Sequence, residues 1–190
     1  MKAARAEWHG LLADVRVDDL VFLDEFGAAT NMTRAWARGP VGQRVVCKSP
    51  HGHWKVISTI AAMTTRGMLC CGTFDGATDT DTFVEYVKVL AGQLRPGQVV
   101  VMDNLPAHRS PRVDQLIEEA GGYVLRLPPY SPDLNPIEMA ISKVKSLLRK
   151  REHRTVETLM TGIEDALKSV SESDARGFIR HCGYSGDRCG

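Results

Sequence analysis

The sequence predicts an α/β fold built on one mixed five-stranded sheet, an antiparallel meander followed by parallel crossover units, with helices flanking the sheet. Two observations support this prediction. Short apolar runs, typical of strands buried on both faces, recur as far as Leu127. Segments with apolar residues at helical spacing begin only after the third expected strand and then alternate with the remaining ones. The expected order of elements is β-β-β-α-β-α-β-α-α.

The five expected strands end at turn residues or at breaks in the apolar pattern. The first ends at Asp24 and is followed by a polar segment, residues 30–44, that predicts a hairpin or irregular loop because Gly39, Pro40 and Gly42 interrupt it. The strands are expected at residues 20–23, 45–46 continued by 55–63, 67–73, 99–102 and 123–127.

The expected helices have apolar residues three and four positions apart. They cover residues 80–94, 111–120, 135–150 and 156–170. The third follows residues 128–136, whose four prolines predict a stiff, extended loop. Asn135 is an N-cap residue type, a proline follows it, and Glu138 lies in the first turn. The loop therefore fixes one carboxylate at the start of a helix.

Length and composition predict one main domain. A chain of 190 residues with 43% hydrophobic content can bury one core, expected at residues 20–170, with a short N-terminal helix or remnant at 1–19 and a flexible C-terminal tail at 171–190. The 24 basic and 23 acidic residues balance, so any nucleic-acid binding must rest on a local patch. No apolar run of membrane-spanning length and no signal-peptide pattern is found, which predicts a cytoplasmic protein without a membrane partner. The five cysteines lack the spacing of a disulfide framework or a zinc site, which predicts reduced thiols.

Three acids are expected to meet in space. Asp24 and Asp103 each end a buried strand, and the carboxyl ends of strands in open α/β sheets face a common crevice. Glu138 begins a helix that must pack across this sheet. Each acid alone has an ordinary explanation as a turn, cap or helix-dipole residue. Together they predict a catalytic set, because clustered carboxylates need a cation and oxygen-only ligands suit Mg²⁺ or Mn²⁺. Two such ions about 3.5–4 Å apart serve in-line attack on a phosphodiester.

Three sequence blocks carry a family resemblance. They are residues 23–25, residues 101–104 with His108, and residues 128–138, which read Pro-Pro-Tyr-Ser-Pro-Asp-Leu-Asn-Pro-Ile-Glu. These blocks resemble the catalytic domain of IS630-type insertion-sequence transposases, bacterial relatives of the Tc1/mariner group. The 34 residues between Asp103 and Glu138 match the DD34E arrangement of that family.

The resemblance implies an RNase H-like fold and a DDE transposase activity. Asp24, Asp103 and Glu138 would be both the catalytic and the metal-binding residues, holding two Mg²⁺ ions, with Mn²⁺ as a substitute. Such enzymes hydrolyse DNA at transposon ends and join the freed 3′-hydroxyl to target DNA. The implied partners are transposon-end DNA, target DNA and a second copy in a homodimer on DNA.

Full-length family members also carry helix-turn-helix domains, for which residues 1–19 are too short. The chain is therefore expected to be the second frame of a split gene, a truncated remnant or an excised domain. A separately encoded helix-turn-helix protein or an upstream reading-frame product is a further expected partner. The alternatives are a catalytically idle remnant, acting through dimerisation or non-specific DNA binding, and another kind of RNase H-like nuclease.

Supporting roles are expected for residues near the acids. Asn104 would orient Asp103 or cap the following turn, and His108 would hydrogen-bond a catalytic carboxylate, a scissile phosphate or only local groups. The basic helix face after Glu138 predicts DNA contacts or, alternatively, a solvated surface that complements the helix dipole. Its candidate DNA-binding residues are Lys143, Lys145 and Arg149.

Three other residues have competing interpretations. Glu25 and Asp133 compete for the acid roles, but strand alternation points Glu25 away from the face of Asp24, and Asp133 lies on a loop. Trp36 would stack on DNA or fold back onto the sheet edge, and the second is favoured.

Overall fold

The computed structural model describes residues 7–8, 10–34, 36–46, 50 and 52–184. At its centre is a five-stranded sheet in the order β3-β2-β1-β4-β5. The first three strands pair antiparallel, and β4 and β5 continue the sheet in parallel beside β1. This arrangement confirms the predicted mixed sheet. The strands are β1 (Leu20–Ala29), β2 (Val56–Thr64), β3 (Gly67–Asp75), β4 (Val99–Met102) and β5 (Tyr123–Arg126).

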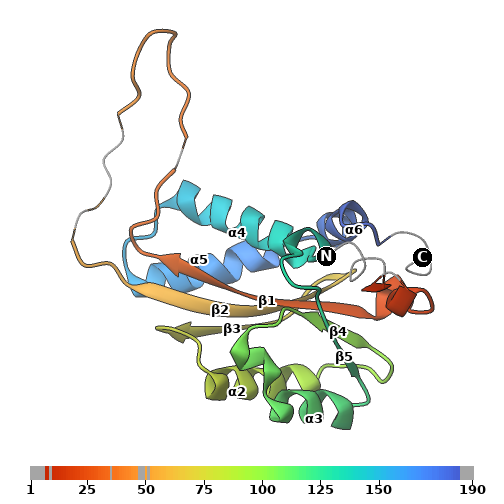
Figure 1. Cartoon of the computed structure of the whole chain (residues 1–190). Helices are drawn as coiled ribbons and strands as arrows, with labels where there is room; N and C mark the ends of the chain where they lie inside the picture. Colours follow the sequence, from red (N-terminus) through yellow and green to blue (C-terminus); the bar gives the residue numbers. More distant parts are fainter. Residues whose placement is uncertain (1–6, 9, 35, 47–49, 51, 185–190) are drawn as a thin grey trace.

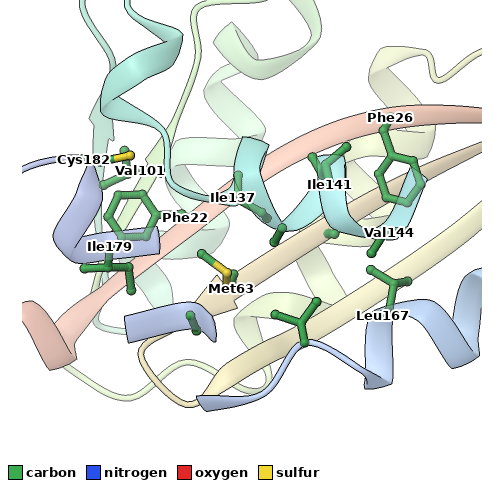
Figure 2. Packing of buried hydrophobic residues seen from close by; sticks show 14 of the residues in the cluster. Phe22, Phe26, Met63, Val101, Ile137, Ile141, Val144, Leu167, Ile179 and Cys182 are labelled. Carbon is green, nitrogen blue, oxygen red and sulfur yellow. The ribbon is translucent and has the colours of Figure 1, made fainter. Parts of the chain in front are cut away.

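Helices cover both faces of the sheet (Figure 1). On one face lie α2 (Thr80–Ala91) and α3 (Pro111–Glu119), and on the other lie α4 (Ile137–Arg151), α5 (Val156–Lys168) and α6 (Glu172–His181). The apolar residues at the start of β1 pack into the hydrophobic cores on both faces of the sheet. Leu20 and Phe22 join the core on the α4 side, where Phe22 lies near Ile137 (Figure 2), whereas Val21 and Leu23 join the core on the α2 side. In the described part of the chain, no helix has both the length and the hydropathy to cross a membrane.

The described parts of the connection between β1 and β2, residues 30–34, 36–46, 50 and 52–55, form a long arm that projects away from the sheet (Figure 1). Its base is closed by the Thr30 amide, which donates to the Lys55 carbonyl over 3.0 Å. Arg154 also donates to the carbonyl oxygens of Thr30 and Met32 over 3.1 and 2.9 Å. The base of the arm is thus tied to the α4–α5 connection.

The arm corrects two predictions. Val45 and Val46 belong to no strand and are exposed, so β2 begins only at Val56. Trp36 is 91% exposed and does not fold back onto the sheet edge. The pairing of β1 with β2 ends at Ala29 and Val56, so Trp36 lies seven residues beyond the last paired position of β1 and outside the sheet.

Residues 171–184 differ from the predicted flexible tail. Ser171 and Asp174 form a reciprocal capping box that starts α6, and Ala175 and Ile179 are buried. After the helix, the Tyr184 hydroxyl donates to the Leu134 carbonyl over 2.6 Å. Serine and glycine content predicts flexibility, but the cap and the buried positions make this segment part of the core. The rest of the predicted tail, residues 185–190, lies outside the described residues.

Candidate active site

The three acids singled out in the sequence line one pocket of about 490 Å³. Asp24 lies in β1, Asp103 directly follows β4, and Glu138 is the second residue of α4. Phe22 pairs with Val101 in the parallel ladder, so Asp24 within β1 and Asp103 just after β4, each two residues further on, lie at the same level of the sheet. The loop 127–132 supplies much of the remaining wall.

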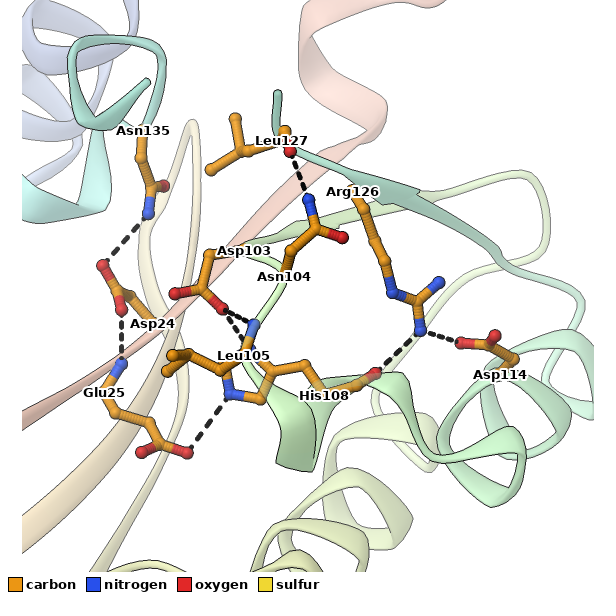
Figure 3. A network of polar contacts seen from close by, with 10 residues as sticks. All are labelled: Asp24, Glu25, Asp103, Asn104, Leu105, His108, Asp114, Arg126, Leu127 and Asn135. Carbon is orange, nitrogen blue, oxygen red and sulfur yellow. Dashed lines mark hydrogen bonds and ion pairs between the residues drawn. The ribbon is translucent and has the colours of Figure 1, made fainter. Parts of the chain in front are cut away.

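Asp24 is held by two hydrogen bonds. Its Oδ1 accepts from the backbone amide of Glu25 over 2.7 Å, and its Oδ2 accepts from the side-chain amide of Asn135 over 3.0 Å (Figure 3). Burial raises the pKa of Asp24 to about 7; the Glu25 amide opposes this rise, and the negative charges of Glu138 and Asp103 add to it. Asp24 therefore binds a proton more tightly than an exposed aspartate does.

Asn135 has a different role from the predicted helix cap. Helix α4 begins two residues later, at Ile137, and has no side-chain cap. The Asn135 side chain is buried and its amide is used on Asp24, while its Oδ1 has no protein partner among the described residues. The proline-rich loop thus positions an amide against Asp24 as well as Glu138 at the helix start.

Asp103 is held from the opposite side of the pocket. Its Oδ1 lies 2.5 Å from Nδ1 of His108 and accepts from the Leu105 amide over 3.0 Å. Burial tends to raise the pKa of Asp103, but the close contact with the His108 ring and the hydrogen bond from the Leu105 amide outweigh it and hold that pKa below its ordinary value. The Asp103 carboxylate is therefore charged at neutral pH.

His108 is fully buried, with a second carboxylate at its other ring nitrogen. Its Nε2 lies 3.3 Å from Oε1 of Glu25. Burial alone would lower the pKa of His108, but its contacts with Asp103 and Glu25 raise it to about 9. Sequence alternation placed Glu25 away from Asp24, and no local signal indicated that its carboxylate reaches His108.

Two further side chains, those of Asn104 and Arg126, connect loops at and near the pocket wall (Figure 3). The Asn104 amide donates to the Leu127 carbonyl over 2.6 Å and so joins the segments that follow β4 and β5. Arg126 donates to the carbonyl oxygen of His108 over 2.7 Å and to Asp114 over 2.6 Å. Asn104 therefore orients the loop rather than the carboxylate beside it.

The remaining candidate residues lie outside the pocket wall. Asp133 is in the 3₁₀ helix η3 (Pro132–Leu134) and lines a neighbouring pocket with Glu138. On α4, Lys143 donates to Asp174 over 2.7 Å, Lys145 Nζ lies 5.8 Å from the ring centre of Phe26, and Arg149 is half-buried. Among the described lining residues, Arg109 carries a positive charge. It was not singled out in the sequence.

The donor set of the pocket suits a hard divalent cation. Its charged donors are carboxylates, the ligands that Mg²⁺ and Mn²⁺ prefer. The described residues contain no group of three acidic, histidine or cysteine side chains close enough to enclose an ion by themselves. An ion at this site would therefore complete its shell with water or substrate oxygens, as Mg²⁺ commonly does.

Comparisons with known proteins point to one family. Residues 19–160 match the model of the DDE superfamily endonucleases. No curated protein sequence matches the chain.

Solved structures of Mos1 transposase share the fold. The Mos1 paired-end complex with left transposon end has a TM-score of 0.73 at 15% identity, over 87% of this chain and 52% of that one. The Mos1 catalytic domain with raltegravir and Mn has a TM-score of 0.71 at 14% identity, over 94% and 87% of the two chains. The chain thus spans about half the length of the Mos1 protein in the paired-end complex and most of the separate catalytic domain.

These matches confirm the predicted RNase H-like fold. The family model covers well over half of the chain, including Asp24, Asp103 and Glu138. The chain belongs to the DDE superfamily endonucleases.

Proposed function

We propose that this chain is the catalytic domain of a Tc1/mariner-type DNA transposase, which hydrolyses phosphodiester bonds at transposon ends and transfers the 3′-hydroxyl into target DNA. The observation that carries the proposal is the convergence of Asp24, Asp103 and Glu138 on one pocket in a DDE superfamily endonuclease. The Mos1 structures, which include transposon-end complexes and forms with Mg or Mn, support DNA as the partner and a divalent ion as the cofactor.

In this mechanism Asp24, Asp103 and Glu138 would hold two Mg²⁺ or Mn²⁺ ions. Two ions held there would supply activation of the attacking water or hydroxyl and stabilisation of the leaving oxygen. Asn135 fixes the orientation of the Asp24 carboxylate. His108 and the Leu105 amide fix the orientation of the Asp103 carboxylate. These contacts lower the reorganisation needed when DNA arrives.

The DNA would pass over the pocket mouth and along α4. Arg109 lines the pocket and is exposed, so its guanidinium can meet a phosphate next to the scissile one. Lys145 and Arg149 extend the positive charge along α4, whereas Lys143 is already paired with Asp174 and adds less. A second copy of the chain and a helix-turn-helix protein would complete the assembly that recognises the transposon ends.

The test is divalent-ion-dependent nicking of a duplex that contains the transposon end. Asp103→Asn and Glu138→Gln are expected to abolish cleavage and leave the circular dichroism spectrum unchanged. Asp133→Asn is the matched control, because Asp133 is an exposed acid five residues before Glu138 and does not line the pocket of about 490 Å³. Retention of cleavage by Asp103→Asn and Glu138→Gln would show the acid assignment to be wrong. An inactive chain that still binds DNA would support the idle-remnant alternative.

A further inference from the structure

The side chains of Glu25, His108 and Asp103 form a continuous line from strand β1 to the end of β4. Nε2 of His108 lies 3.3 Å from Oε1 of Glu25, and Nδ1 lies 2.5 Å from Oδ1 of Asp103. The contact with Glu25 has hydrogen-bond geometry, whereas the contact with Asp103 is a close ion pair, because Nδ1 has no aligned hydrogen-bond partner among the described residues. The Glu25 carboxylate is thus connected, through the buried ring of His108, to Asp103, which is far away in the sequence (Figure 3).

The ring of His108 has little freedom to turn. One face stacks on Phe83, with ring centres 4.1 Å apart and planes inclined by 27°. Its own backbone is fixed at both ends, since its amide donates to the Leu105 carbonyl and its carbonyl accepts from Arg126. Because the side chain is fully buried, it does not contact DNA directly, which leaves the carboxylates as its partners.

The contact determines which oxygen of Asp103 is available. Oδ1 is occupied by the His108 ring and by the Leu105 amide. The other oxygen points to the side of Asp24 and the pocket (Figure 3). A carboxylate that is hydrogen-bonded through one oxygen presents the other in a fixed direction, and such outer contacts commonly govern how well a ligating group holds its ion.

We propose that Glu25 is a positioning residue, which acts through His108 to fix the Asp103 carboxylate and thereby strengthens the binding of a divalent cation in the pocket. The proposal rests on the proposed function, because it takes Asp103 as a ligand. It assigns Glu25 a role different from that of a competing catalytic acid. Glu25 does not line the pocket, so its effect on the ion passes through the ring.

The experiment measures the affinity of the purified chain for Mn²⁺, by the electron paramagnetic resonance signal of the free ion. Glu25→Ala removes the acceptor at Nε2 and is expected to weaken Mn²⁺ binding by roughly 10–100-fold. Glu25→Gln keeps an oxygen that can accept from Nε2, so it is expected to weaken Mn²⁺ binding less than Glu25→Ala does. Equal losses in the two variants would contradict positioning through this hydrogen bond.

A double variant separates positioning from direct ligation. If Glu25 acts through His108, then Glu25→Ala combined with His108→Gln is expected to bind Mn²⁺ no more weakly than His108→Gln alone. If the loss of Mn²⁺ affinity in the double variant equals the product of the losses in the two single variants, Glu25 acts on the ion independently of His108, and the proposal is overturned. Should His108→Gln fail to fold, the comparison of Glu25→Ala with Glu25→Gln decides.

Two controls distinguish failure of this proposal from failure of the proposed function. Glu85→Ala removes an exposed carboxylate of α2 that pairs with Lys88 and is expected to leave Mn²⁺ affinity unchanged. Asp103→Asn tests the site itself. If Asp103→Asn abolishes Mn²⁺ binding but Glu25→Ala does not weaken it, Glu25 has no positioning role and the metal site stands. If Asp103→Asn binds Mn²⁺ normally, the site assignment fails.

Discussion

The side-chain amide of Asn135 donates to the carboxylate of Asp24 over 3.0 Å, across 111 positions of sequence. One residue belongs to the loop that leads into α4, and the other to the central strand β1. The bond therefore joins the element that carries Glu138 to the element that carries Asp24. It explains why a stiff loop precedes α4: a mobile loop could not hold a buried amide against the half-buried carboxylate of Asp24.

Replacing Asn135 is expected to impair cleavage more than folding. Asn135→Ala removes a hydrogen bond to a charged group, which contributes about 1.5–3 kcal/mol and corresponds to a fall of roughly 10–100-fold in the nicking rate. Asn135→Asp would add a negative charge beside Asp24 and is expected to be worse still. Asn31→Ala, in the turn after β1, is the matched control. An unchanged rate for Asn135→Ala would mean that Asp24 is positioned by its other contacts.

The raised pKa of Asp24 predicts how stability depends on pH in the metal-free protein. Its pKa is 3.8 as the ordinary value and about 7 in the folded chain, so folding binds the proton more tightly. The stability from this group is fully present below pH 4 and is lost as the pH rises through 7. Asp24→Asn carries no charge at any pH, and it is therefore expected to be more stable than the natural chain at pH 8 and similar to it at pH 4.

The size of this effect follows from the pKa difference. One pKa unit is worth about 1.4 kcal/mol, and with allowance for coupling to Asp103 and Glu138 the gain at pH 8 is about 2–4 kcal/mol. At about 2–4 °C for each kcal/mol in a chain of this size, thermal melting in EDTA would detect it easily. Addition of Mg²⁺ is expected to narrow the gap by stabilising the natural chain. An equal shift at pH 4 and pH 8 would show that packing, and not charge, is responsible.

The turn between β2 and β3 makes Gly67 a sensitive position. Gly67 has φ +113°, and a Cβ there would lie 2.9 Å from the carbonyl oxygen of Val170, next to the start of α6. Gly67→Ala is expected to destabilise the protein by about 1–3 kcal/mol, through backbone strain and this clash. Gly177→Ala is the control, because Gly177 lies within α6 with nothing near its Cβ position, and it is expected to stabilise the protein by up to about 1 kcal/mol. Urea unfolding of both variants measures the free energy of unfolding, which is expected to fall for Gly67→Ala and to rise for Gly177→Ala.

The apolar pattern predicted some strands well and others only in part. Strand β4 matches the predicted residues 99–102, because its four apolar residues are all buried and a turn and Asp103 bound them. Strand β1 was expected to end at Leu23 but continues to Ala29. Beyond Asp24 its residues pair with β2, and only Phe26 and Ala28 are buried. Pairing with a distant strand, which local hydrophobicity does not reveal, extends it.

The candidate site shows the same division between local and distant information. The three acids were predicted to converge because two of them end apolar strands and the third starts a helix, and they line one pocket. The contacts of Asn135 and Glu25 were missed, because each depends on a partner more than 80 positions away. Asn135 has an ordinary local interpretation as a cap, and only the tertiary structure reveals that its amide is used elsewhere.

Tyr184 links the C-terminal segment to the loop that carries Asn135. Its hydroxyl donates to the Leu134 carbonyl over 2.6 Å and accepts from the Trp8 indole over 3.2 Å, while its ring lies 5.2 Å from that of Phe22. Tyr184→Phe keeps the ring and leaves two buried polar groups without this partner, so it is expected to destabilise the protein by about 1–3 kcal/mol. Since Leu134 directly precedes Asn135, the nicking rate should also fall, even well below the melting temperature.

Urea unfolding and cleavage at 20 °C below the melting temperature measure these two effects separately. Tyr123→Phe is the control, because Tyr123 is 64% exposed on β5 and is expected to change neither stability nor rate. A Tyr184→Phe chain that loses stability but cleaves at the natural rate would show that the Leu134 carbonyl anchors the fold without positioning Asn135. Loss of both would establish that the segment after α6 supports the loop of the candidate active site, since the substitution leaves every residue that lines the pocket unchanged.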